Sequence, residues 1–131
     1  MNLPQIFLFI TAAGLLPIAL SYGVNPPGSL GFLFGMTVDG TNGVHIFRAI
    51  MGLYLALIVF WVLGARRASL TRPALYSLVV FMFGLAAGRV LSLLVDGVPH
   101  WLLSVYLVLE LMFGAIGLMM LRRLERAVSP R

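Results

Sequence analysis

The chain has 131 residues, of which 61% are hydrophobic and 10% are charged, and its formal net charge is +5. A soluble domain averages about 45–50% apolar and about 25% charged residues, so this composition excludes an ordinary soluble domain and indicates an integral membrane protein. Cysteine is absent, which excludes disulfides and thiolate metal sites. All nine basic residues are arginines, and most of them flank apolar runs. That placement is typical of topology signals rather than of a nucleic-acid surface, so we expect no nucleic-acid partner.

The first apolar run covers about residues 4–23. It lacks the basic start of a signal peptide and is long for a signal-peptide core, so we predict a retained first membrane span. Residues 24–42 follow as a connection rich in glycine and proline. The apolar stretch SLGFLFGM within it predicts a short helix or a re-entrant turn at the membrane interface.

Three further apolar runs cover about residues 43–64, 73–95 and 101–121. Each of the four runs holds about 20 residues, enough for a helix to cross a hydrocarbon layer of roughly 30 Å. Backbone groups in lipid must be hydrogen-bonded within the segment, which favours helices. The sequence therefore predicts an all-α fold, a single four-helix transmembrane bundle over residues 1–131.

The arginines predict the orientation of this bundle. They cluster in the connection 65–72 and after residue 121, and the connections 24–42 and 96–100 contain none. By the positive-inside rule, the arginine-rich segments and both termini lie in the cytoplasm. Trp61 and Trp101 lie near span ends and fit interfacial anchors.

Three charged residues, Arg48, Arg89 and Glu110, fall inside the apolar runs. A charge at that depth costs about 2.5–3.5 kcal/mol on insertion scales, so we expect the three groups to be buried against one another around a cavity or a ligand. Helical spacing places each of them in a polar or small-residue stripe, and such stripes normally face the bundle interior. The stripes are His45, Arg48 and Gly52; Arg89, Ser92 and Asp96; and Tyr106, Glu110, Gly114 and Gly117. Gly84 and Gly88 form a further small-residue pair, which we expect to pack within the bundle.

Several interpretations of these charges remain open. They could form a structural network between helices or an outward-facing site for an anionic group. Alternatively, the two arginines extend to lipid headgroups without forming a pocket. Glu110 is either the ion-pair partner of Arg89 or a proton-carrying group. A metal site formed by Asp39, His45, Asp96 and His100, or a haem between the two histidines, is chemically possible. Neither has motif-level spacing, and we predict no metal and no cofactor.

The stretches VDGTNGVHIFRAIMGLYL, GRVLSLLVDGVPHW and YLVLEL resemble a bacterial inner-membrane family, the domain of unknown function 4345 family. The similarity covers about residues 20–122, and the architecture is more loosely similar to DoxX-like proteins. The resemblance implies a small four-helix protein of the bacterial inner membrane and brings no established activity. The family's characteristic positions fall on Asp39, Gly40, His45, Arg48, Arg89, Asp96, Pro99 and Glu110.

Three functions compete. The first is binding of an anionic or amphipathic small molecule or lipid in an intramembrane pocket, and oligomers are possible. Its expected ligand-binding residues are Arg48, Arg89, Glu110, His45, Tyr106, Asp39, Asp96 and Ser92. The second is a proton-coupled transporter, for which small multidrug exporters are an imperfect parallel because their glutamate lies on the first helix. The third is a lipid-modifying enzyme with Glu110 or His45 as base, which no nucleophile motif supports.

Overall fold

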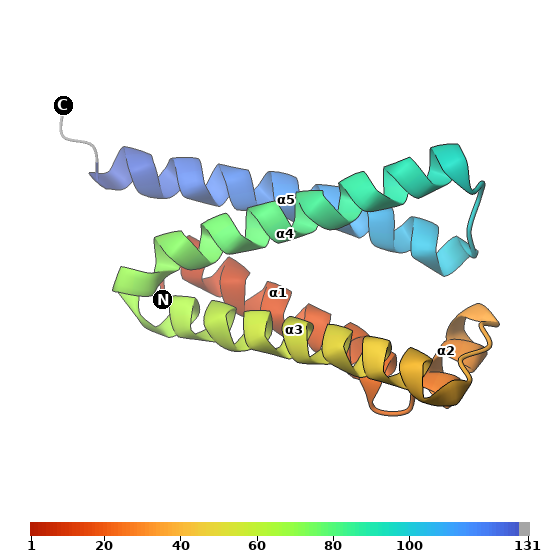
Figure 1. Ribbon diagram of the computed structural model, residues 1–131. Helices are drawn as coiled ribbons and strands as arrows, with labels where there is room; N and C mark the ends of the chain where they lie inside the picture. Colours follow the sequence, from red (N-terminus) through yellow and green to blue (C-terminus); the bar gives the residue numbers. More distant parts are fainter. Residues whose placement is uncertain (129–131) are drawn as a thin grey trace.

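The computed structural model describes residues 1–128, and those residues form five helices and no strand (Figure 1). The helices are α1 (Leu3–Gly23), α2 (Pro26–Phe34), α3 (Gly40–Arg66), α4 (Ala68–Val95) and α5 (Trp101–Val128). Four of them, α1, α3, α4 and α5, are long and apolar enough to cross a membrane. This confirms the predicted all-α, four-helix membrane fold. The chain is therefore a multi-pass membrane protein by length and composition of its helices.

Local signals in the sequence explain where the first helices begin and end. Asn2 caps α1: its side chain accepts a hydrogen bond from the Gln5 amide at 3.0 Å, and the Gln5 side chain accepts one from the Asn2 amide at 3.0 Å. Helix α2 begins at Pro26, a residue favoured in the first turn, and its last residue is followed by the C-cap Gly35, whose φ of 66° suits glycine. The short helix expected in the 24–42 connection is thus present.

The long helices form two pairs, α1 with α3 and α4 with α5, joined by the short connection from α3 to α4 (Figure 1). The two pairs lie close together near the N-terminus and the α3–α4 connection. They diverge toward α2 and the turn at residues 96–100. We call these the closed end and the open end of the bundle.

The closed end holds the best-packed part of the core. Six residues there have no exposed surface: Leu8, Trp61, Ala65, Ala74, Leu75 and Leu78. Gly64 lets α3 and α4 approach so closely that a Cβ atom at this position would collide with the Ala74 side chain. Thr71 adds a hydrogen bond from its hydroxyl to the Gly64 carbonyl at 2.7 Å. Residues of α3 before the turn and of α4 after it are therefore in direct contact, and these contacts fix the turn between the two pairs.

Trp61 is not an interfacial anchor, and that expectation was wrong. Its indole is fully buried, donates to the Ser77 hydroxyl at 3.0 Å and packs edge-on against Phe81. Trp101, at the start of α5, is 68% exposed and keeps the exposure that an anchor needs. The two tryptophans thus differ in role because one lies between the helix pairs and the other at the open end.

The glycines of α5 and of α4 differ in whether a neighbouring helix packs against them. Gly114 and Gly117 lie against Phe83 and Val79 of α4, as the interior stripe on α5 predicts. Gly84 and Gly88 of α4 have no neighbouring atom within 4 Å of an added Cβ. The expectation that this pair packs within the bundle was wrong, because α4 turns that face away from its neighbours.

Candidate functional site

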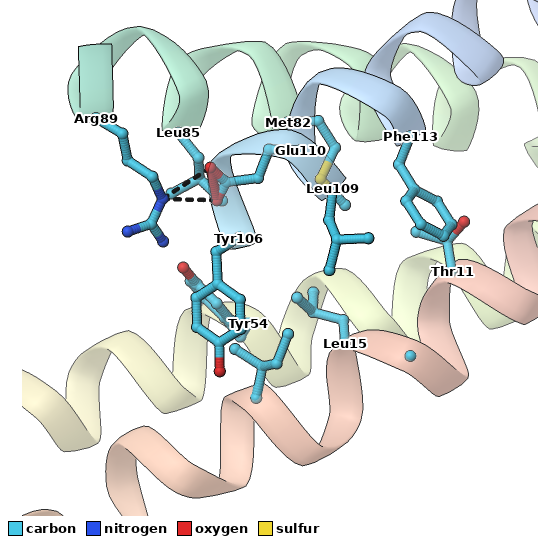
Figure 2. A pocket seen from close by; sticks show the side chains of 12 residues that line it. Thr11, Leu15, Tyr54, Met82, Leu85, Arg89, Tyr106, Leu109, Glu110 and Phe113 are labelled. Carbon is cyan, nitrogen blue, oxygen red and sulfur yellow. Dashed lines mark hydrogen bonds and ion pairs between the residues drawn. The ribbon is translucent and has the colours of Figure 1, made fainter. Parts of the chain in front are cut away.

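A cavity of about 290 Å³ lies between the two helix pairs. Its walls come from α1, α3, α4 and α5, and most of the lining is apolar, including Leu15, Leu85, Leu109 and Phe113. Figure 2 shows the Arg89–Glu110 pair with Tyr54 and Tyr106 at one end of this space and Phe113 and Thr11 at the other. The divergence of the pairs therefore leaves a hydrocarbon-lined space with one polar end.

An ion pair between α4 and α5 forms that polar end. Arg89 Nε donates to both carboxylate oxygens of Glu110, at 2.7 and 3.0 Å. The Glu110 side chain is 8% exposed and that of Arg89 is 22% exposed. A carboxylate buried this deeply needs a cation, since an unpaired charge in the membrane interior is costly. Of the two interpretations of Glu110 that the sequence left open, the ion pair with Arg89 is the one that the structure confirms.

Two tyrosines surround the pair. The Arg89 guanidinium lies over the Tyr106 ring, with 5.6 Å from Cζ to the ring centroid, a cation–π geometry. Tyr54 of α3 is only 6% exposed and lines the same cavity. Within residues 1–128, neither tyrosine hydroxyl has a hydrogen-bond partner, and no fully enclosed side-chain polar atom lacks one. Both hydroxyls therefore face open space.

Arg89 also has unused donors. Its two short hydrogen bonds to Glu110 come from Nε, and the Tyr22 hydroxyl of α1 is a second side-chain group within hydrogen-bonding reach of the guanidinium. A guanidinium has five N–H donors in a planar fork. These donors outnumber the two partners, so the polar end of the cavity presents the remaining donors of Arg89 and the hydroxyls of Tyr54 and Tyr106, while Glu110 already accepts from Arg89.

Helix α2 reaches across the open end to this site. The Phe34 ring at its last residue lies edge-on against Tyr106 and His100, with ring centroids 6.2 and 5.9 Å apart. A smaller hollow of about 100 Å³ lies between α4 and α5 and is lined by Arg89, Ser92 and Pro99 among others. Arg89 therefore borders both the large cavity and a hollow that leads toward the turn at residues 96–100.

Some predicted site residues lie elsewhere. Arg48 and His45 are exposed and line a separate shallow depression near the start of α3. Asp39 is exposed just before α3, and Asp96 is exposed and accepts a hydrogen bond from Ser92 at 2.6 Å. The expected convergence of all three intramembrane charges was therefore wrong for Arg48. Within residues 1–128, the structure also gathers no group of three or more metal-ligating side chains, so the four residues of the possible metal site do not form one.

Helical periodicity explains the error on α3. The buried residues of this helix are Tyr54, Ile58, Trp61 and Ala65 with Gly64, and they follow helical spacing. At about 100° per residue, Tyr54 lies about 120° from Arg48 and about 180° from His45 around the helix axis. The polar stripe of α3 is therefore on the side opposite its buried face. The helical spacing of the apolar residues on α3 could have identified Tyr54 as a buried residue. The spacing of the polar residues alone did not indicate it.

A family model described as a domain of unknown function, DUF4345, matches residues 3–121. The chain belongs to this family. Searches of curated proteins and of solved structures gave no match. Membership in DUF4345 agrees with the four apolar helices and brings no activity, so the function has to be argued from the cavity itself.

Proposed function

We propose that this DUF4345 protein binds an amphiphile with a single hydrocarbon chain, whose polar end carries oxygen atoms that accept hydrogen bonds. The cavity volume of about 290 Å³ is at the lower limit of small-molecule sites, which span about 300–1,000 Å³. A space of this size suits one hydrocarbon chain rather than the two chains of a bilayer lipid. The leucine and phenylalanine side chains that line it supply the apolar contact.

The observation that carries the proposal is the set of donors at the polar end. The Arg89 guanidinium has five N–H donors, more than its two protein partners, Glu110 and the Tyr22 hydroxyl, take up, and the hydroxyls of Tyr54 and Tyr106 have no hydrogen-bond partner in the described chain. Since Glu110 already balances the charge of Arg89, a carbonyl or ester oxygen suits these donors better than a second full negative charge. This narrows the anionic or amphipathic ligand class expected from the sequence toward a neutral acceptor group.

The ion pair between Arg89 and Glu110 makes a transporter or an enzyme a less favourable proposal than a binding protein. Both oxygens of Glu110 accept from Arg89 Nε, so the carboxylate is held in an ion pair. A proton-coupled transporter or an enzyme using Glu110 as base would have to break this pair in every cycle. Binding requires no such step, and we therefore prefer it to transport and to lipid modification. The proposal includes a bacterial inner-membrane location with the open end facing the periplasm, based on the arginines at the closed end.

The test measures binding of a monoacylglycerol with one 16-carbon chain to the purified protein in a neutral detergent, by native mass spectrometry. Tyr54→Phe removes one donor and keeps the ring. Loss of one hydrogen bond in this setting weakens binding about threefold to tenfold. Tyr76→Phe is the matched control, because the Tyr76 hydroxyl lies at the closed end and donates to Glu125 at 3.2 Å.

A second variant tests the cavity itself. Leu109→Trp places a larger side chain in the space between the helix pairs and is expected to abolish binding while the protein still melts cooperatively. Equal binding by wild type and Leu109→Trp would contradict the proposal. A fatty acid that binds much more tightly than the monoacylglycerol would show that the site prefers a full negative charge, contrary to the argument from Glu110.

A further inference from the structure

Arg48 is the second arginine in an apolar span, and its surroundings differ from those of Arg89. Helix α3 has 27 residues, about 40 Å at 1.5 Å per residue, so each end extends about 5 Å beyond a hydrocarbon layer of about 30 Å. Arg48 lies eight residues after Gly40, about 12 Å along the axis, which places its Cα about 7 Å inside that layer. The residue is exposed on the outer surface of the bundle. Its guanidinium can reach the headgroup level by extending along the helix.

No carboxylate of the described chain compensates this charge. The one ion pair within residues 1–128 is that of Arg89 with Glu110. Asp96 accepts from Ser92, and Glu125 accepts from Tyr76 at the closed end. Asp39 lies before the first turn of α3, about 13 Å along the axis from Arg48. A cation at this depth therefore needs an anion from its surroundings.

We propose that Arg48, His45 and Thr41 bind the phosphate group of a membrane glycerophospholipid. The three residues recur at helical spacing on one face of α3 and line one shallow depression together with Gly40 and Val44. Guanidinium groups bind phosphate with paired hydrogen bonds, and an imidazole and a hydroxyl supply further donors. The site is independent of the cavity and of its ligand.

The surface below Arg48 fits the rest of the lipid. The same face of α3 continues toward the closed end through Gly52, Ala56 and Val59, all exposed. An added Cβ at Gly52 meets nothing within 4 Å. This strip of small side chains leaves room for an acyl chain to lie along the helix while the phosphate stays at Arg48. A free phosphate ion has no such contact and would have to lose its water at the membrane boundary, so the depth of Arg48 favours the lipid.

The experiment measures phosphatidylglycerol binding to the purified protein in a neutral detergent, by native mass spectrometry. Arg48→Gln is expected to weaken the tightest binding event about tenfold, because it removes charge-assisted hydrogen bonds. His45→Gln is expected to weaken it less. Arg66→Gln is the matched control: Arg66 is an exposed arginine on the same helix at the closed end, and its loss should leave the tightest event unchanged. Arg48→Lys keeps the charge and is expected to bind with intermediate affinity.

Four results would overturn the proposal. Equal weakening by Arg66→Gln would show general attraction of anionic lipid to any arginine. Equal binding of diacylglycerol, which has the same chains without phosphate, would show that the chains alone determine binding. Displacement of the lipid by millimolar inorganic phosphate would identify a site for the free ion. Because Arg48 is exposed, Arg48→Gln should melt like the wild type, and a large loss of stability would show that the residue is needed by the fold instead.

Discussion

The two ends of the bundle are built differently from the same four helices. At the closed end, small residues and fully buried side chains bring α1, α3 and α4 into contact, and Thr71 and Trp61 make hydrogen bonds between α3 and α4. At the open end, the helix pairs diverge around a cavity, an ion pair joins α4 to α5, and Phe34 of α2 adds aromatic edges, while tight packing there lies within the α1–α3 pair, where Gly23 meets Met51. The difference shows that tight helix packing and the cavity lie at opposite ends of the bundle. The closed end holds the two helix pairs together, and the open end is where we propose that a ligand binds.

The largest expected difference between the ends is that between the two tryptophans. Trp61→Ala removes a fully buried indole and its hydrogen bond to Ser77 at the closed end. Removing a large buried aromatic side chain costs about 3–5 kcal/mol. Trp101→Ala, at the open end, changes a side chain that is 68% exposed. A substitution of that kind usually changes stability by less than about 0.5 kcal/mol.

Unfolding of both variants by a denaturing detergent, followed by circular dichroism, measures this difference. Equal destabilisation by Trp101→Ala and Trp61→Ala would contradict the assignment of most of the folding stability to the closed end. That result would place a substantial share of the folding energy at the open end, through contacts of α5 with α2 or with the lipid.

A smaller effect is expected from two glycines of the same helix. Gly64→Ala forces α3 away from Ala74 at the closed end, and such overpacking costs about 1–3 kcal/mol. Gly52→Ala, nearer the open end, meets nothing within 4 Å. It is expected to be neutral or to stabilise the helix by up to about 1 kcal/mol, because alanine has the higher helix propensity. Thermal melting in detergent measures both, and the same sign of change in the two variants would contradict the assignment of tight packing to the closed end.

The fold could be predicted from the sequence because membrane helices follow from the length and hydropathy of the runs alone. The four apolar runs each fall within one long helix, and the short helix in the 24–42 connection was expected from its apolar middle. The pairing of Arg89 with Glu110 was also predictable, since both charges lie deep in neighbouring spans and a buried charge requires a partner.

The rest of the site could not be read from polar residues in isolation. Arg48 and His45 form a good stripe, but nothing in their spacing says whether a stripe faces the bundle or the lipid. An arginine near a span end can extend to the headgroups, so it tolerates the outer face that a deeper charge does not. Trp61 was misplaced for a related reason, because a tryptophan near a span end suits either the interface or a helix contact, and only the position of Ser77 on α4 decides between them.

The smallest perturbation tests which end faces which side of the membrane. The chain contains no cysteine, so a single introduced cysteine is the only thiol. Val98→Cys changes a residue that is 89% exposed in the turn at the open end, and Ser69→Cys changes an exposed residue early in α4 at the closed end. Neither substitution removes a buried contact, so both variants are expected to fold like the wild type, within about 0.5 kcal/mol.

A maleimide that cannot cross the inner membrane is added to intact bacterial cells. It should label Val98→Cys at once and Ser69→Cys only after the membrane is disrupted, because the arginines at the closed end favour the cytoplasm. The reverse pattern would place the cavity mouth and Arg48 on the cytoplasmic side. The two proposed lipid sites would then draw their ligands from the inner leaflet, while the difference between the closed and the open end would stand unchanged.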